Sequence, residues 1–165
     1  MWLAPKKGVV MASLREEAEY FRLGLILKLL DNDAIVDWAD RTISKSDDPP
    51  IEIIEIALAG KMPLEEMTSL LKSVPGQGDL SVGAHQTLRL LRDQLGAGTI
   101  TLESAVNTLW AYHQCAFVEE AEKSQAVSFS NLLYMAQEGE GGTLESVQEE
   151  VLSFLTGQTL QLPLT

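Results

Sequence analysis

His113 is the residue of this 165-residue chain whose type is best suited to acid–base chemistry. A buried imidazole beside other titratable groups can serve as a general base near neutral pH. It lies eleven residues after Leu102 and continues the apolar stripe of Val106 and Leu109 along a predicted helix. Two interpretations follow: a ligand pocket lined by His113 and Tyr112, or a core histidine hydrogen-bonded to a carbonyl group. We favour the core histidine.

Cys115 is the only cysteine, and a thiol can act as a nucleophile when a histidine lies beside it. Two residues along a helix turn about 200°, so we expect the Cys115 thiol to point away from His113. The other histidine, His85, lies at the edge of the apolar stripe of its own predicted helix, where we expect it to be at the surface. That stripe consists of Ala84, Leu88, Leu91 and Leu95. The sequence therefore predicts no catalytic residue. A single cysteine also excludes an internal disulfide and fits a reducing compartment.

The stretch DNDAIVDWAD, residues 31–40, places four aspartates in ten positions, which raises the question of a calcium loop. Ile35 stands where such a loop needs an oxygen ligand, Val36 replaces the turn glycine, and Thr42 replaces the bidentate glutamate. The stretch GQGDLS, residues 76–81, lacks the lysine and third glycine of a phosphate-binding loop. The sequence therefore predicts no metal and no cofactor.

The aspartates are explained by an amphipathic helix that begins with Asp33 as its N-cap. Counted at about 100° per residue, Asp33, Asp37 and Asp40 fall on one face of that helix. Ile35 and Trp38 fall on the opposite side. We therefore expect a buried apolar stripe and a solvent-exposed acidic face.

The stretch DDPPIEIIEIALAG, residues 47–60, could form a strand or a helix, since isoleucine favours strands. The alternation of a strand breaks at Ile54–Glu55, however, and prolines suit the first turn of a helix. With Asp48 as its cap, we predict a helix whose apolar stripe consists of Ile51, Ile54 and Leu58.

The charge of the chain limits its partners. Acidic residues outnumber basic residues by 24 to 12, which gives a formal net charge of −12. Residues 31–60 hold eight acids against Arg41 and Lys45, and residues 93–165 hold ten acids against Lys123. Such a field repels phosphate backbones and anionic membranes, so we expect no nucleic-acid or membrane binding. The acids either keep the surface soluble or face a basic partner.

Helix start signals recur along the chain. Ser13 and Glu16 form a predicted capping box that opens a helix running to about Leu30. The word TLES occurs at Thr101 and again at Thr143, each time as a threonine cap before an apolar stripe. Breaks at glycine and proline separate the helices. We predict an all-α, compact bundle of seven to eight short helices without significant sheet, with helical-hairpin repeats as one arrangement.

The expected organisation is a flexible leader over residues 1–12, a single helical domain over 13–156 and an extended tail over 157–165. Met11 is an alternative start to Met1. The apolar run of the leader is too short for a signal peptide, and no uncharged apolar stretch is long enough to span a membrane. We expect a cytoplasmic protein.

Four stretches resemble short, helical bacterial proteins to which no activity is assigned: FRLGLILKLL, DWADRTI, DDPPIEIIEIALAG and GTLESVQEEVLSFL. The resemblance implies a bacterial source and an all-helical fold, and it carries over no catalytic residue. Small acidic proteins of this size and charge include toxin-neutralising immunity proteins.

The sequence favours a non-enzymatic protein-interaction module that binds a basic protein, with an immunity protein as a special case. The alternative is a small enzyme or ligand-binding domain that uses His113, and a third hypothesis is a homo-oligomer joined through IEIIEIALAG. The tryptophans border apolar stripes, so core packing is their favoured role. The candidate contact residues are acids of two predicted helices and two aromatic anchors: Asp33, Asp37, Asp40, Glu52, Glu55, Trp38 and Trp110.

Overall fold

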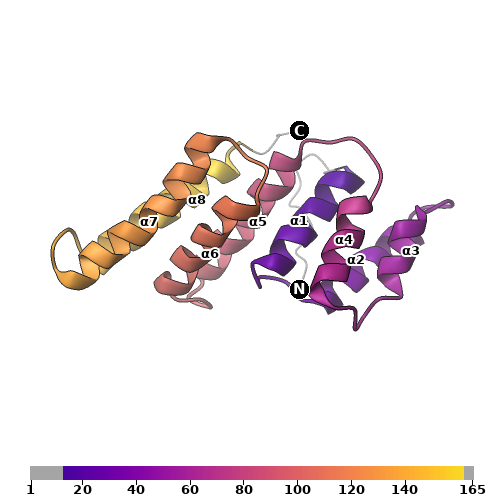
Figure 1. Ribbon diagram of the computed structural model, residues 1–165, viewed down its shortest axis with the longest axis horizontal. Helices are drawn as coiled ribbons and strands as arrows, with labels where there is room; N and C mark the ends of the chain where they lie inside the picture. Colours follow the sequence, from indigo (N-terminus) through magenta and orange to yellow (C-terminus); the bar gives the residue numbers. More distant parts are fainter. Residues whose placement is uncertain (1–12, 162–165) are drawn as a thin grey trace. The chain divides into compact units, whose positions relative to one another are not determined.

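The computed structural model describes residues 13–161, and these residues form helices and no strand (Figure 1). The predicted all-α class is therefore confirmed, as is the number of helices within the described part of the chain. The helices are α1 (Leu14–Ile26), α2 (Asn32–Ser44), α3 (Ile51–Ala57), α4 (Leu64–Ser73), α5 (Leu80–Gly96), α6 (Leu102–Cys115), α7 (Glu120–Glu138) and α8 (Leu144–Thr159).

The chain divides into two compact units, which among the described residues comprise 13–83 and 84–161. We call them unit 1 and unit 2 and describe each by itself. Helix α5 begins in unit 1 and carries the chain into unit 2.

Helix α1 begins at the predicted cap but ends earlier than Leu30. The Ser13 hydroxyl accepts from the Glu16 amide, and the Glu16 carboxyl group accepts from the Ser13 amide, which confirms the capping box. The helix stops because Lys28 adopts a left-handed conformation, with φ 59°. The following amide of Leu29 then donates back to the Gly24 carbonyl at 2.8 Å, which is the pattern of a Schellman cap.

The N-cap of helix α2 lies two residues before the predicted one. Asp31, not Asp33, is the N-cap, and its carboxyl group accepts from the Ala34 amide at 2.9 Å. Asp31 directly precedes the first turn and Asp33 lies within it, where a carboxyl group complements the positive end of the helix dipole. The prediction of the helix was right, and the prediction of its capping residue was wrong.

Helix α3 buries the face opposite to the predicted one. Ile53 and Ile56 are fully buried, whereas Ile51 and Leu58 are 62% and 83% exposed. The N-cap is Pro50 rather than Asp48, and it makes no side-chain cap. The sequence could not decide between the faces because isoleucines lie on both sides of this short helix, and only the packing of its neighbours selects one.

The core of unit 1 lies among its first four helices. Helix α1 packs against α4, α2 packs against α3, and α3 packs against α4. The Phe21 ring stacks on the Trp38 ring with 4.7 Å between centroids. The buried residues of this core are Ala18, Phe21, Leu25, Ile35, Trp38, Ala39, Ile53, Ile56, Ala59, Met67, Leu71 and Val74.

Helix α1 also buries an ion pair. The Arg22 guanidinium donates two hydrogen bonds to the Glu19 carboxyl group, at 2.7 and 2.6 Å, and both side chains are buried. A bidentate pair satisfies both oxygens of the acid, which is the condition under which two charges can be buried together.

The first turn of α5 lies directly against α1 within unit 1. A Cβ atom on Gly83 would lie 2.6 Å from the Glu16 carbonyl oxygen and 2.9 Å from the Tyr20 amide nitrogen. The two backbones therefore approach so closely that only glycine fits. The preceding loop is held as well, since the Asp79 amide donates to the Glu16 carboxyl group at 2.9 Å.

Within unit 2, helices α6, α7 and α8 pack in sequence order. Helix α7 packs against both α6 and α8, and Figure 1 shows α7 in orange next to α8 in yellow. Thr101 and Thr143 both cap helices through their hydroxyl groups, as the repeated TLES predicts. The buried stripe of α5 consists, as predicted, of Ala84, Leu88, Leu91 and Leu95.

The predicted extended tail is wrong in its first part. Helix α8 continues to Thr159, so residues 157–159 are helical. Gly157 lies inside this helix, with open space around its Cα atom. The predicted leader, residues 1–12, and the last part of the tail, residues 162–165, lie outside the described residues.

The close approach of α5 to α1 predicts opposite effects for two glycine-to-alanine changes. Gly83→Ala places a methyl group against backbone atoms that cannot rotate away, and we expect the free energy of unfolding to fall by about 1–3 kcal/mol. Gly157→Ala, in open space on α8, is the matched control and should raise it by about 0.5–1 kcal/mol. Urea denaturation followed by circular dichroism measures both, and equal effects would contradict the close contact.

Candidate functional site

The acidic face predicted for α2 is present. Asp33, Asp37 and Asp40 are all exposed, and Ile35 and Trp38 are buried on the opposite side of the helix. Positions separated by four and then three residues lie one above the other on a helix. The three carboxyl groups therefore form one exposed acidic stripe along α2.

Helix α3 carries the other two predicted acids. Glu55 is exposed, whereas Glu52 is half-buried. Helices α2 and α3 pack against each other within unit 1, so the two acid-bearing helices are neighbours. Residues 46–60 contain no lysine, arginine or histidine. We call the exposed sides of these two helices, with Asp33, Asp37, Asp40 and Glu55, the acidic surface.

Trp38 lies in the core and is only 3% exposed. Its ring stacks on Phe21, and its indole nitrogen donates to the Glu17 carboxyl group at 3.1 Å. Burial raises the pKa of the Glu17 carboxyl group above its ordinary value of 4.5, and the Trp38 hydrogen bond opposes this increase. Trp38 therefore has the core role and presents no ring to a partner.

Trp110 and His113 lie together at the surface of unit 2. Trp110 is 46% exposed, and the His113 ring meets it edge-on with 5.4 Å between centroids. The His113 Nδ1 atom pairs with the Trp110 carbonyl oxygen, and the imidazole is only half-buried. The expected burial of His113 is therefore wrong, and the residue lies at the surface in the last turn of α6, which ends at Cys115.

Tyr112 turns away from His113 into the interior. It is fully buried, and its hydroxyl group donates to the Glu122 carboxyl group at 2.6 Å. The second oxygen of Glu122 accepts from the His85 Nε2 atom at 2.8 Å. His113 and Tyr112 therefore have different partners, and the structure does not bring them together in one pocket.

The network of His85, Tyr112 and Glu122 joins α5, α6 and α7 of unit 2, and the sequence did not reveal it. His85 was expected at the surface but is 6% exposed. Helix α5 is buried over a wider arc than its aliphatic stripe, since Thr87 on the other flank is also fully buried. The only sequence signal was a histidine and a tyrosine next to apolar stripes, with an acid in the first turn of the following helix.

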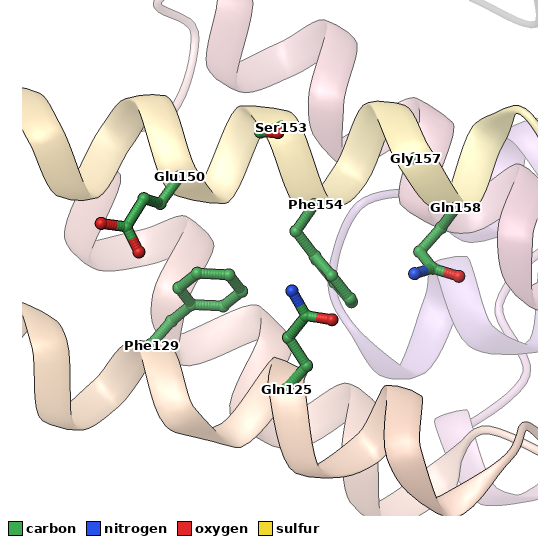
Figure 2. Close-up of a pocket in the computed structure, with 7 residues that line it drawn as sticks. All are labelled: Gln125, Phe129, Glu150, Ser153, Phe154, Gly157 and Gln158. Atoms are coloured by element: carbon green, nitrogen blue, oxygen red, sulfur yellow. The ribbon is translucent and has the colours of Figure 1, made fainter.

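An open groove of about 390 Å³ lies between α7 and α8 (Figure 2). Phe129 and Phe154 point into it from the two helices, with 5.5 Å between their ring centroids. The polar groups around these rings are amide, hydroxyl and carboxyl groups, which can bind a ligand by hydrogen bonds. They belong to Gln125, Gln158, Ser153 and Glu150.

Comparisons with known proteins give no further guide to this site. No protein-family model matches the chain, and neither the curated proteins nor the solved structures contain a match. Among residues 13–161, no three histidine, cysteine or acidic side chains are grouped to hold a metal ion. None of the helices described combines the length and the apolar character needed to cross a membrane.

The buried hydrogen bond of Tyr112 predicts a loss of stability in Tyr112→Phe. Removing the hydroxyl group leaves one oxygen of Glu122 without this donor, and we expect the free energy of unfolding to fall by about 1.5–3 kcal/mol. Tyr134→Phe, at an exposed tyrosine of α7, is the matched control and should change it by less than about 0.5 kcal/mol. Equal urea midpoints for the two variants would count against the network.

The raised pKa of Glu17 predicts a pH-dependent effect of Glu17→Gln. The folded state binds this proton more tightly than the unfolded state, so wild-type stability falls as the pH rises from 4.5 through the raised folded-state pKa. Glutamine keeps an acceptor for Trp38 without the charge. We expect the variant's advantage in unfolding free energy to grow from pH 4 to pH 7. Glu65→Gln, on the exposed side of α4, is the control, since it shows how the loss of one negative charge alone changes the free energy of unfolding. An advantage that shrinks with pH would refute the assignment.

Proposed function

We propose that this chain is a non-enzymatic protein-interaction module whose acidic surface on unit 1 binds a basic protein. The observation that supports the proposal is the exposed stripe of Asp33, Asp37 and Asp40 beside a second acid-bearing helix. Acids that are simply solvated are usually interspersed with bases. Here eight acids stand against two bases over residues 31–60.

The charge on this surface acts mainly on the rate of association. A one-signed patch attracts an oppositely charged protein over roughly the Debye length, about 8–10 Å at physiological salt, and raises the association rate. It also selects among partners, because a like-charged protein is repelled. The proposed partner is therefore a protein with a lysine- and arginine-rich face. We place this function in the bacterial cytoplasm, consistent with the single cysteine.

A toxin-neutralising protein is a special case of such a module. The captured partner would then be a basic toxin domain, and co-expression of this chain would restore growth to cells that produce the toxin. If the captured partner has no effect on growth, the proposal of a toxin-neutralising protein fails, and the proposal of a general interaction module stands.

Neutralising the acidic stripe should weaken capture of the partner. The variant Asp33→Asn/Asp37→Asn/Asp40→Asn removes three exposed charges, and we expect at least a ten-fold slower association, since steering contributes factors of 10 to 10³. The measurement is affinity capture from bacterial lysate with identification by mass spectrometry, followed by surface plasmon resonance with the purified partner at several salt concentrations.

The control removes the same number of charges from unit 2, as Glu138→Gln/Glu140→Gln/Glu149→Gln, three exposed acids of α7, α8 and the loop between them. This control should retain the partner with binding that weakens as salt rises. Equal loss in both variants, or binding that does not depend on salt, would contradict the proposal.

A further inference from the structure

Helix α3 exposes apolar side chains to solvent although it also contributes to the core. Ile53 and Ile56 are fully buried in unit 1, whereas Ile51 and Leu58 are among the most exposed large apolar residues of the described chain. Ile54 is half-buried between these two faces. A helix that is apolar on both sides has one face in the core and one face without a covering element.

The exposed apolar residues form one stripe. Counted at about 100° per residue, Ile54, Leu58 and Ile51 fall within about 60° of arc, on the side opposite to the buried isoleucines. The stripe runs over the whole helix, about 10 Å at 1.5 Å per residue. Single exposed apolar residues are normal on protein surfaces, but a contiguous stripe marks a contact site. We call these three residues the α3 stripe.

The chemistry around the α3 stripe indicates which partner would cover it. Glu55 borders the stripe on the same exposed side of the helix, and the exposed Asp47 and Asp48 lie three to four residues before the helix begins. No base occurs between residues 46 and 60. Within residues 46–60 the charges beside the apolar contact are therefore all negative, and the nearest bases in the sequence, Lys45 and Lys61, lie just outside this segment.

This charge argues against a second copy of the chain as the occupant. In a two-fold symmetric dimer each surface meets itself, so the acids of one copy would face the same acids of the other. Like charges brought together in this way disfavour the contact. An anionic lipid surface is disfavoured for the same reason.

We propose that the α3 stripe is the anchor site for a basic amphipathic helix of the protein partner. This inference rests on the proposed function and names the element that the partner supplies. An amphipathic helix docks through apolar residues at positions i, i+3 or i+4, and i+7, which span two helical turns. The α3 stripe also spans two turns, so its length matches that of such a helix face. Lysine and arginine residues on the flanks of that helix lie opposite Glu55 and the acids before α3.

The test uses a synthetic peptide of 18 residues as the probe, made of leucine and lysine with leucine at helical i, i+3, i+4 and i+7 spacing and a fluorescent label. A second peptide has the same composition in an order that forms no apolar stripe. A third peptide has glutamate in place of lysine. Fluorescence anisotropy measures the Kd of each peptide for the full chain.

The protein variants distinguish binding at the α3 stripe from nonspecific binding to exposed apolar residues. Ile51→Ser/Leu58→Ser removes two anchors that are exposed, so the fold and the thermal midpoint should be retained, as circular dichroism can verify. Leu144→Ser/Leu160→Ser removes two exposed leucines of unit 2 and is the matched control. We expect the stripe variant to bind the first peptide at least ten-fold more weakly and the control to bind like wild type. The second and third peptides should bind wild type at least ten-fold more weakly than the first.

Other results would overturn the inference. Equal binding by the stripe variant, or equal binding of the reordered peptide, would mean that charge alone attracts the probe. A dimer in sedimentation that Ile51→Ser/Leu58→Ser dissolves would make a second copy the occupant. If lysate capture depends on the aspartates of α2 but not on Ile51 and Leu58, the proposed function stands and the anchor does not. If capture depends on neither, both proposals fail.

Discussion

The carboxyl group of Glu16 connects two regions of unit 1 that are far apart in the sequence. One oxygen accepts from the Ser13 amide and completes the cap of α1, and the other accepts from the Asp79 amide in the loop before α5. The Asp79 carboxyl group in turn accepts from the Ser81 amide at the start of α5. The beginnings of two helices thus depend on one side chain. The Asp79 contact lies four residues before Gly83, where the α5 backbone approaches that of α1.

The close contact at Gly83 has a consequence for the acidic surface. Helices α2 and α3 are short, and neither could be stable alone, because isolated helices of fewer than about 12–15 residues are marginal in water. They are held by packing against α1 and α4, whose positions are fixed in part by the loop and the first turn of α5. The exposed acids and the α3 stripe therefore lie on helices that are packed against the core of unit 1, and such preorganisation would lower the conformational entropy lost on binding the proposed partner.

Features that depend on local sequence were predictable. The predicted N-caps are present at Ser13, Thr101 and Thr143. Each hydroxyl group accepts a hydrogen bond from the backbone amide three residues later, so the cap needs no partner from elsewhere in the chain. The buried stripe of α5 and the exposed acids of α2 also followed from periodicity alone. In α2 only the capping residue was wrong, because Asp31 and Asp33 are equally good caps by type.

Features that depend on neighbours were not predictable. The choice of the buried face of α3 rests on the helices that pack against it, and the sequence of α3 offers isoleucine on both sides. The burial of His85 rests on Glu122, which is 37 residues away and supplies the partner that makes a buried imidazole acceptable. The end of α1 depends on Leu30, which folds back over Gly24 so closely that a Cβ there would lie 2.5 Å from its Cδ1 atom. The first two cases are contacts between residues that no local pattern connects, whereas the third is a local Schellman cap at Lys28, a residue type that does not usually mark one.

An exposed apolar stripe is a hazard to a soluble protein, because it can pair with the same stripe of another copy. On α3 the surrounding acids lessen this hazard, since two copies that meet through the stripe also bring their acids together. The same acids attract a basic helix, for which the charge is favourable and the apolar contact is equally available. In the proposed complex, the charge would therefore act mainly on which protein approaches the stripe, and the apolar side chains on how long it stays bound, since desolvated apolar anchors act mainly on dissociation and long-range charge on association. Within that complex, the net charge of −12 and the exposed side chains of Ile51 and Leu58 act together to select the partner.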